Sequence, residues 1–248
     1  MASNTTYIVE PTAAHTHTVI FLHGRDSNGR EFADELFESE ASETVGQLAD
    51  QSRTLPDLLP NIRWVFPNAP VLQSERFGIE MSQWFDMWSL DDPTERPELQ
   101  QPGLDQSVNE IFEVIKEEET LVPQEQIFLA GISQGFVTAV VVFLTKANPS
   151  KSFAGLIGLC SWLPAAFLTG DYKKFDRREK IGSTPIFLGH SEDDDVVPID
   201  CGLELEDFLR SQGLRVEWID YYEGGHWVNE PQGVDDIARF IRKRTTEN

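Results

Sequence analysis

The chain has 248 residues, of which 40% are hydrophobic and 25% are charged, and its formal net charge is −22. A chain of this length and ordinary composition can bury a large core and a water-excluding site. The negative charge argues against nucleic acid and anionic membrane surfaces as partners, because both would be repelled. No apolar run approaches the roughly 20 residues that span a bilayer, so stable membrane insertion is not expected.

The sequence predicts one domain over residues 1–248, because no linker rich in proline, glycine or serine divides it. We expect residues 1–17 and 245–248 to be loosely ordered. The two cysteines, Cys160 and Cys201, form neither a disulfide framework nor a Cys-x-x-Cys metal pattern. The first residues lack a basic stretch followed by an apolar core. These features together predict a reducing, cytoplasmic location.

Short apolar and β-branched runs recur along the chain, separated by segments of helical period. Most of these runs are continuously apolar, as in parallel strands that are buried on both faces. The predicted strands are Thr18–Leu22, Ile62–Phe66, Gln126–Ala130, Phe153–Leu159, Pro185–Leu188 and Arg215–Tyr221.

Amphipathic segments lie between these runs and predict helices. Three of them place Leu104, Val108, Ile111, Phe112 and Ile115, then Leu205, Phe208 and Leu209, then Val234, Ile237, Phe240 and Ile241 on single helical faces. The last segment closes with Arg242, Lys243 and Arg244, cations that suit a helix C-terminus. This alternation predicts an α/β fold with a mostly parallel central sheet and helices on both faces.

Two regions break the alternation. Residues 38–50 are acidic and weakly periodic, and we interpret them as a surface insertion. Residues 73–102 are rich in proline, aspartate and aromatic residues. An aromatic loop of this kind either lines a pocket or packs against the core, and the sequence leaves both possibilities open.

Ser133 is the candidate nucleophile, in Gly131-Ile132-Ser133-Gln134-Gly135. It follows a predicted strand and precedes the apolar stretch Phe136–Leu144. A serine between glycines at a strand-to-helix junction is typical of the nucleophile elbow of α/β-hydrolases, a sharp turn that exposes the hydroxyl above the sheet edge. A mere tight turn is the alternative interpretation, and the strand–turn–helix context favours the catalytic one.

His226 is the candidate base. A serine hydroxyl is a weak nucleophile until a base accepts its proton, and in this fold serine, acid and histidine follow in that order after successive strands. His15, His17 and His23 precede Ser133, and His190 precedes the acidic run. His226 remains, after two glycines that follow the predicted strand Arg215–Tyr221.

The candidate acid lies in the run Asp193-Asp194-Asp195. A carboxylate here would orient the imidazole and stabilise its charged form in the transition state. Spacing does not choose among the three aspartates. A calcium loop is disfavoured, because the run lacks alternating ligands around a central glycine, and a solvated acidic turn is the other alternative.

The oxyanion hole needs two N–H donors. Gln134 directly follows the nucleophile and supplies the first. The second is expected from Arg25, in the loop Leu22-His23-Gly24-Arg25-Asp26 after the first predicted strand, where Gly24 lets the backbone approach the substrate. His23 is interpreted as a packing residue of this loop. The mechanism requires no cofactor and no metal.

Taken together, these stretches resemble the acyl-protein thioesterase and carboxylesterase branch of the α/β-hydrolases, the phospholipase/carboxylesterase family. The matching stretches are Phe21 to Gly24, Phe66 to Pro70, Trp84-Phe85-Asp86, Gly131 to Gly135, Ser161 to Pro164, Asp194 to Pro198 and Gly225-His226. They cover the chain in order from about residue 18 to residue 241. The resemblance selects Asp194 as the acid, four positions before Pro198.

The resemblance implies a serine esterase or thioesterase whose substrates include S-acylated cytoplasmic proteins. It also implies that Trp84, Phe85, Trp162 and Leu163 flank an acyl channel. Arg25 and Trp227 are bulkier than the family's usual residues at these positions, and we expect them to narrow the site and favour short acyl groups. A lysophospholipase is the second enzymatic hypothesis, and a catalytically silent binding protein on the same fold is the third.

Overall fold

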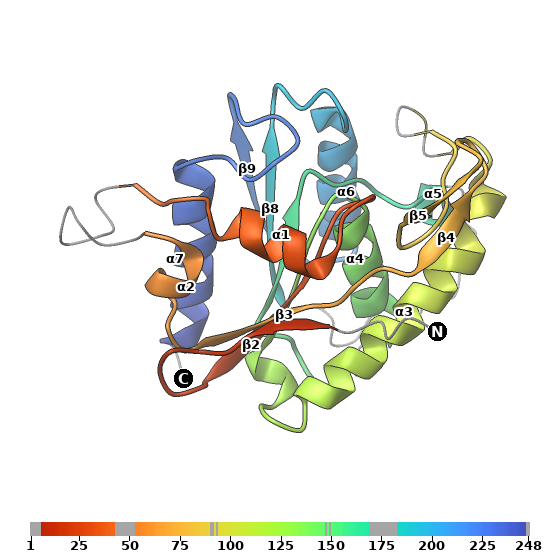
Figure 1. Ribbon diagram of the computed structural model, residues 1–248. Coiled ribbons are helices and arrows are strands. Elements are labelled where there is room, and N and C mark those ends of the chain that lie inside the picture. Colours follow the sequence, from red (N-terminus) through yellow and green to blue (C-terminus); the bar gives the residue numbers. More distant parts are fainter. Residues whose placement is uncertain are drawn as a thin grey trace.

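The computed structural model describes residues 6–42, 53–89, 92, 94–146, 148, 150–168 and 183–246. Within these residues, seven strands form one twisted sheet in the order β1-β3-β2-β6-β7-β8-β9 (Figure 1). All neighbours are parallel except β1, which pairs antiparallel with β3. The strands are β1 (Tyr7–Val9), β2 (His17–Leu22), β3 (Ile62–Phe66), β6 (Ile127–Ile132), β7 (Gly155–Leu159), β8 (Pro185–Ser191) and β9 (Arg215–Tyr221).

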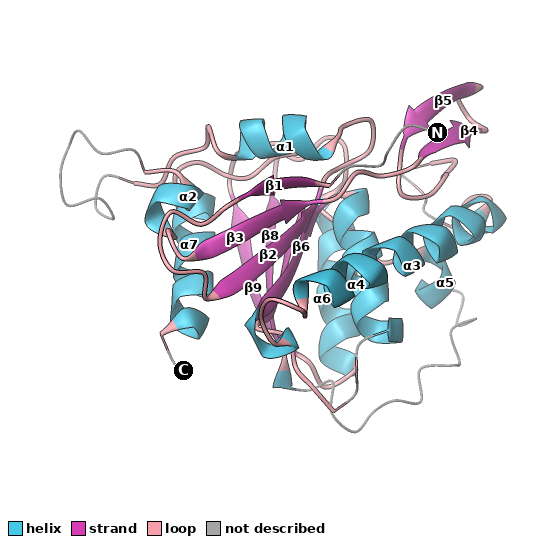
Figure 2. Ribbon diagram, turned by 60° about the horizontal axis from the view of Figure 1, so that its bottom comes forward, coloured by secondary structure: helices cyan, strands magenta, loops and turns pink. Residues whose placement is uncertain are grey.

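Helices cover both faces of this sheet (Figure 2). One face carries α1 (Gly29–Leu36), α2 (Leu55–Leu58) and α7 (Gln232–Thr245), and the other carries α3 (Gln100–Glu118), α4 (Gln134–Lys146) and α6 (Ile199–Ser211); the short α5 spans Ala165–Leu168. The predicted α/β class, the α/β-hydrolase fold, is confirmed. Among the described helices, none combines the length and apolar composition that crossing a membrane requires.

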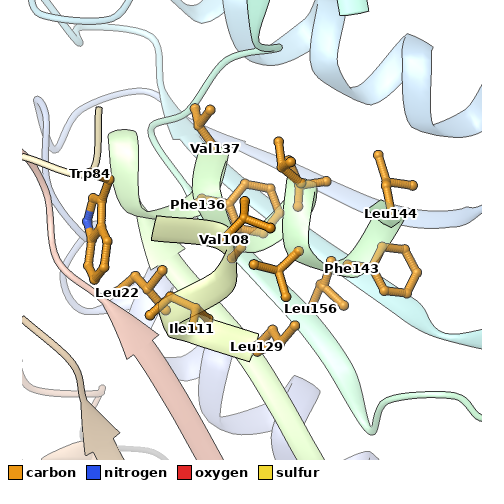
Figure 3. Close-up of a cluster of buried hydrophobic side chains, with 14 of the residues drawn as sticks. Leu22, Trp84, Val108, Ile111, Leu129, Phe136, Val137, Phe143, Leu144 and Leu156 are labelled. Carbon is orange, nitrogen blue, oxygen red and sulfur yellow. The ribbon is translucent and has the colours of Figure 1, made fainter. Parts of the chain in front are cut away.

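The core has two halves because strand side chains alternate between the faces of the sheet. In β2, Ile20 and Leu22 join the cluster under α3 and α4, whereas Val19 and Phe21 join the cluster under α1 and α7. Figure 3 shows part of the first cluster, in which side chains of α3 and α4 meet the sheet. All six residues of β2 are buried, as expected for a central parallel strand.

The structure changes the bounds of four predicted strands: β2 begins one residue earlier, at His17, and β7 begins two residues later, at Gly155. β6 ends at Ile132 instead of Ala130, so Ser133 follows the strand directly, and β8 continues to Ser191. A small hairpin of β4 (Val71–Ser74) and β5 (Ile79–Ser82) was not predicted. It stands off the core, with Val71 66% and Ile79 55% exposed, so no buried apolar run marks it in the sequence.

The expectation of loose ends is wrong for part of each terminus. Tyr7–Val9 forms β1, whose backbone pairs with β3, and the Tyr7 ring lies 6.4 Å from that of Phe66. At the other end, Thr245 still belongs to α7. Residues 1–5 and 247–248 lie outside the described residues.

The predicted surface insertion is described only over residues 38–42, since 43–50 lie outside the described residues. In the described part, Glu38 and Glu40 are exposed, while Ser39 and Ala41 are buried and anchor the segment. The Glu40 N–H donates to Glu230, and the Ser42 N–H donates to Asp235 on α7. The alternating exposure of acidic and small residues explains why no clear period was visible.

Candidate active site

A cavity of about 220 Å³ opens at the carboxyl ends of the parallel strands. Its walls come from the loops after β2, β6, β7, β8 and β9, together with α1 and the segment around Met87. Strands β2 and β6 are neighbours although three strands separate them in the chain, and such a change of direction is where α/β sheets place their ligand sites. The lining residues are Gly24, Arg25, Ser27, Phe32, Glu35, Met87, Ile132, Ser133, Gln134, Trp162, Val196, His226 and Trp227.

Ser133 sits in a strained turn between β6 and α4. Its φ of 55° is in the left-handed region that residues other than glycine rarely adopt. The neighbouring glycines are required sterically. A Cβ on Gly131 would lie 2.4 Å from the backbone nitrogen of Phe136, and one on Gly135 would lie 2.3 Å from the carbonyl oxygen of Leu22. Glycine is therefore required on both sides of Ser133, because a Cβ at either position would clash with the backbone of a neighbouring segment.

His226 and Asp194 form a hydrogen-bonded pair. The imidazole Nδ1 of His226 lies 2.8 Å from Oδ2 of Asp194, and the two residues come from the loops after β9 and β8. A carboxylate can only accept, so Nδ1–H is the donor and Nε2 is free to accept a proton. Because His226 and Ser133 line the same cavity, that second nitrogen is the one available to the serine.

The Asp194 carboxylate is held in its charged form. Burial alone would raise the pKa of Asp194, but hydrogen bonds from His190 and His226, together with the backbone N–H of Val197, hold it well below its usual range. Oδ1 accepts the N–H groups of Val196 at 2.9 Å and Val197 at 2.8 Å, and Nε2 of His190 lies 3.2 Å from Oδ2. A fixed negative charge at this position suits the acid of a triad.

The three aspartates of the acidic run have different positions. Asp194 is 6% exposed and contacts the histidine, whereas Asp193 and Asp195 are exposed. Asp193 accepts the N–H of Gly225 at 2.8 Å and so secures the loop just before the base. Of the three aspartates, Asp194 is the one that contacts His226. It is also the one that the resemblance selects, whereas spacing alone does not choose among the three.

The predicted oxyanion loop lies beside the nucleophile. A Cβ built on Gly24 would lie 3.8 Å from the Cβ of Ser133. The next residues are pinned to the hairpin, since the N–H of Asp26 donates to the carbonyl of Ser82 at 2.7 Å. Gln134 is fixed through its side chain, which accepts the N–H of Trp84 at 2.8 Å and donates to the carbonyl of Phe85 at 2.7 Å.

Two of the five predicted substrate-binding residues line the cavity, namely Trp162 and Trp227. Trp84 and Phe85 are fully buried, Leu163 is 5% exposed, and none of the three lines the cavity. Their contact with the substrate stays a prediction, which the lining of this cavity does not support. The sequence leaves open whether this aromatic loop lines a pocket or packs against the core. In the structure, the side chains of Trp84 and Phe85 pack in the core, and their backbone groups form hydrogen bonds with the side chain of Gln134.

His23 is a structural residue of the oxyanion loop. Its Nδ1 lies 2.6 Å from the carbonyl of Gly24, and its Nε2 accepts the N–H of Ala69 at 3.0 Å. Trp84 donates its indole N–H to the carbonyl of His23. Burial lowers the pKa of His23 to about 4, so the ring is neutral at pH 7. The packing role predicted from the sequence agrees with these contacts.

A family model described as phospholipase/carboxylesterase matches residues 3–245 of this chain, which is nearly its whole length. The chain belongs to the phospholipase/carboxylesterase family. It is a serine hydrolase of the kind that cleaves carboxylic esters and acyl thioesters.

Similar proteins support this membership over full-length alignments. Acyl-protein thioesterase 1 of Yarrowia lipolytica is 32% identical over 239 residues, which cover 95% of each chain. Acyl-protein thioesterase 1 of Cryptococcus neoformans var. neoformans serotype D is 29% identical over 94% of each chain. The crystal structure of Zea mays acyl-protein thioesterase 2 superposes with a TM-score of 0.71 at 25% identity, over 98% of this chain and 100% of that one.

Sequence reasoning missed several residues of this phospholipase/carboxylesterase site. Met87 lines the cavity, and it directly follows the motif Trp84-Phe85-Asp86. Val196 lines it directly after the acidic run. His190 was excluded as the base by its place in the chain, and it instead supports the acid. A histidine at the end of a strand, four residues before that acid, was the available signal.

Proposed function

We propose that Ser133, His226 and Asp194 carry out a two-step acyl transfer. Ser133 Oγ attacks the carbonyl carbon of an ester or thioester while its proton passes to Nε2 of His226. The tetrahedral intermediate collapses, the proton moves to the leaving alcohol or thiol, and an acyl-enzyme remains. Water then attacks the acyl-enzyme with His226 again as the base, which releases the acid and restores Ser133.

The N–H groups of Arg25 and Gln134 are proposed to hold the oxyanion in both steps. The proposal is supported by position: the loop that contains Arg25 lies beside Ser133, and Gln134 begins α4 directly after it. Removing one such donor typically costs about 10²–10³ in rate. The observation that carries the mechanism is the 2.8 Å contact between His226 and Asp194 at the wall of the cavity that Ser133 lines.

We propose a preference for short acyl groups. The cavity of about 220 Å³ is smaller than the roughly 300–1,000 Å³ typical of drug-sized ligand sites. One wall is the edge-to-face pair of Trp227 and Phe32, whose ring centroids lie 5.7 Å apart. The indole N–H of Trp227 also donates to Ser39 at 3.4 Å, which holds the ring in place. Bulk at Trp227 is thus fixed rather than free to swing aside.

S-acylated proteins are the proposed natural substrates. The support is that the relatives aligned over their full length are named acyl-protein thioesterases. We further propose a reducing, cytoplasmic location, supported by the low cysteine content and by Cys160, which is buried and forms no disulfide. A lysophospholipase is the second candidate activity and shares the family description.

The test is a chain-length series of p-nitrophenyl esters and matched acyl thioesters, with lysophosphatidylcholine as a further substrate. The proposal expects the highest kcat/KM for short chains, and Trp227→Ala should shift the optimum to longer chains. Trp88→Ala is the matched control, because Trp88 is a half-buried tryptophan that does not line the cavity. Ser133→Ala should abolish every activity. A wild-type optimum at long chains, unmoved by Trp227→Ala, would refute the short-chain preference, and faster turnover of the lysolipid would favour the second candidate.

A further inference from the structure

The turn at the end of β7, residues Leu159–Ser161, begins with the last residue of the strand. It contacts the loop of Ser133 and the loop of His226. We propose that this turn is a positioning element of the active site, and that the thiol of Cys160 holds the loop of His226 in register with Ser133. The inference rests on the proposed function of these residues and adds a role for a side chain that the acyl transfer itself does not use.

Leu159 and Ser161, the first and last residues of the turn, bond the backbone of Ser133. The backbone N–H of Ser133 donates to the carbonyl of Leu159 at 2.8 Å, and the hydroxyl of Ser161 donates to the carbonyl of Ser133 at 3.0 Å. Ser161 is 3% exposed, so this bond is shielded from water. Both backbone polar groups of the strained serine are therefore bonded to a single short segment.

Cys160, the middle residue of the turn, contacts the loop of His226. Sγ of Cys160 lies 3.5 Å from the carbonyl oxygen of Trp227 and 3.9 Å from that of Gly225, the residues on either side of His226. Sγ, a carboxylate oxygen of Asp194 and a ring nitrogen of His226 all lie within 4.8 Å of one another. The thiol thus sits against the acid and the base at once.

The environment keeps this thiol in its donor form. Burial, with the negative charge of Asp194 beside it, raises the pKa of Cys160 far above its usual range. A protonated thiol is a weak hydrogen-bond donor and a poor nucleophile, so a positioning role fits and a catalytic one does not.

The backbone of Cys160 is itself constrained. Its φ is 48°, in the left-handed region, and its N–H donates to the carbonyl of Gly189 on β8 at 3.0 Å. Such a conformation persists in a residue other than glycine only when its surroundings over-determine it, and strained residues of this kind cluster at functional sites. The turn is therefore bonded to β8, the nucleophile and the base loop together.

Loss of the thiol should move the imidazole relative to Ser133 without changing the walls of the cavity, since Cys160 does not line it. A misplacement of about 1 Å can cost about 10²-fold in rate. We expect Cys160→Ala to lower kcat for a short p-nitrophenyl ester at least about tenfold while KM stays nearly constant. Cys160→Ser, which keeps a donor of similar size, should restore most of kcat. Ser161→Ala should lower kcat through the nucleophile.

The experiment measures kcat, KM, the pH profile of kcat/KM and the melting temperature of these variants. Cys201→Ala is the matched control, because Cys201 is the chain's other cysteine and lies on α6, outside the lining of the cavity. Cys160→Ala should also shift the acid limb of the profile, which reports the essential base of the free enzyme. If Cys160→Ala does not fold, Cys160→Gly takes its place, since glycine adopts a φ of 48° without strain.

Wild-type kcat and pH profile in folded Cys160→Ala or Cys160→Gly would overturn the inference. Equal losses in the serine and alanine variants would also overturn it, because size and not the donor would then matter. The proposed function fails separately, if Ser133→Ala keeps wild-type activity. Inactive Ser133→Ala beside fully active Cys160 variants would leave the acyl transfer standing and refute the positioning role alone.

Discussion

At the residue scale, the chemistry depends on a carboxylate that stays charged inside the protein. Asp194 receives its hydrogen bonds from two histidine rings and two backbone N–H groups, which replace the water that it loses on burial. A group whose folded pKa is lowered stabilises the fold above its unfolded pKa of about 3.9, and this stabilisation is lost as the pH falls toward the folded pKa. At neutral pH the contribution is fully present.

Asp194→Asn removes this charge and keeps the shape of the side chain. We expect kcat to fall by about 10³–10⁴, because the amide can present a donor to Nδ1 and favour the wrong tautomer of His226. The measurement is steady-state hydrolysis of a short p-nitrophenyl ester. Asp195→Asn is the control, since Asp195 is exposed, and it should behave as wild type. Wild-type turnover in Asp194→Asn would remove this residue from the triad.

His23 should make the free energy of unfolding rise with pH. A surface histidine with an acidic partner would have the opposite effect, because its folded pKa is raised. The folded pKa of His23, about 4, lies below the unfolded value of about 6.5, so the unfolded chain binds more protons between these values. The free energy of unfolding should therefore fall as the pH drops from about 6.5 to about 4, by up to about 3 kcal/mol from this residue. An NMR titration of the His23 ring, assigned with His23→Gln, should show a midpoint near 4, and a midpoint near 6.5 would contradict the buried, neutral ring.

The sequence restricts the proposed nucleophile and base to single candidates through chain order and local glycines, and the structure places Ser133 and His226 at one cavity. The acid required more than spacing, since three adjacent aspartates differ only in burial and in the direction of their side chains. Trp84 and Phe85 show the limit of motif reading. A motif marks a segment, but packing decides which side chains of that segment face the cavity. Here the side chain that lines the cavity is that of Met87, directly after the motif.

At the scale of elements, the oxyanion loop is braced by the hairpin β4–β5. The guanidinium of Arg25 donates to Oγ of Ser74 at 3.1 Å, lies 3.8 Å from Asp86, and stacks on the ring of Phe77 at 5.1 Å. These contacts fix the loop whose backbone N–H is proposed to bind the oxyanion. We therefore propose that the hairpin supports catalysis by holding this loop, although none of its residues lines the cavity.

Arg25→Met should lower kcat about tenfold with little change in KM, because a displaced N–H weakens binding of the oxyanion more than binding of the substrate. Arg76→Met is the matched control: Arg76 also stacks on Phe77, at 5.6 Å, but does not line the cavity. Steady-state kinetics of both variants on one short ester make the comparison. Equal effects of the two substitutions would show that the brace does not act through the oxyanion loop.

The central strands were predictable from sequence, because strands buried on both faces are continuous apolar runs. β3 matches its predicted bounds, β2 and β8 are longer, β6 runs Ile127–Ile132, and β7 begins at Gly155 instead of Phe153. The edge strand β9, whose residues vary in exposure, also matches its predicted bounds. The missed strands β1, β4 and β5 lie at an edge or off the core. β1 is only three residues long, with Tyr7 and Val9 packed against the core, and β4 and β5 are four residues each and largely exposed, so none of the three offers a run long enough to mark it in the sequence.

At the scale of the whole molecule, the net charge of −22 favours cationic substrates. Glu35 on α1 lines the cavity and is exposed, so part of this charge stands at the site itself. S-acylated cysteines that lie beside basic residues would be attracted to such a surface. The field of exposed charges is screened by salt, with a Debye length of about 30 Å at 0.01 M and about 3 Å at 1 M.

Turnover of a basic acyl-peptide should therefore fall as the ionic strength rises across this range, while turnover of a neutral acyl-peptide stays constant. The measured quantity is kcat/KM for each peptide at each salt concentration. Glu35→Gln should reduce the salt response of the basic peptide. An equal response of both peptides would exclude electrostatic selection of the substrate.

The most direct test of the central claim is covalent labelling of the intact protein with a fluorophosphonate probe, located by mass spectrometry of its peptides. We expect one adduct per chain, on Ser133. It should be absent from Ser133→Ala and should form far more slowly in His226→Ala, whose fold should remain intact. Persistent labelling of Ser133→Ala at another serine would contradict the claim.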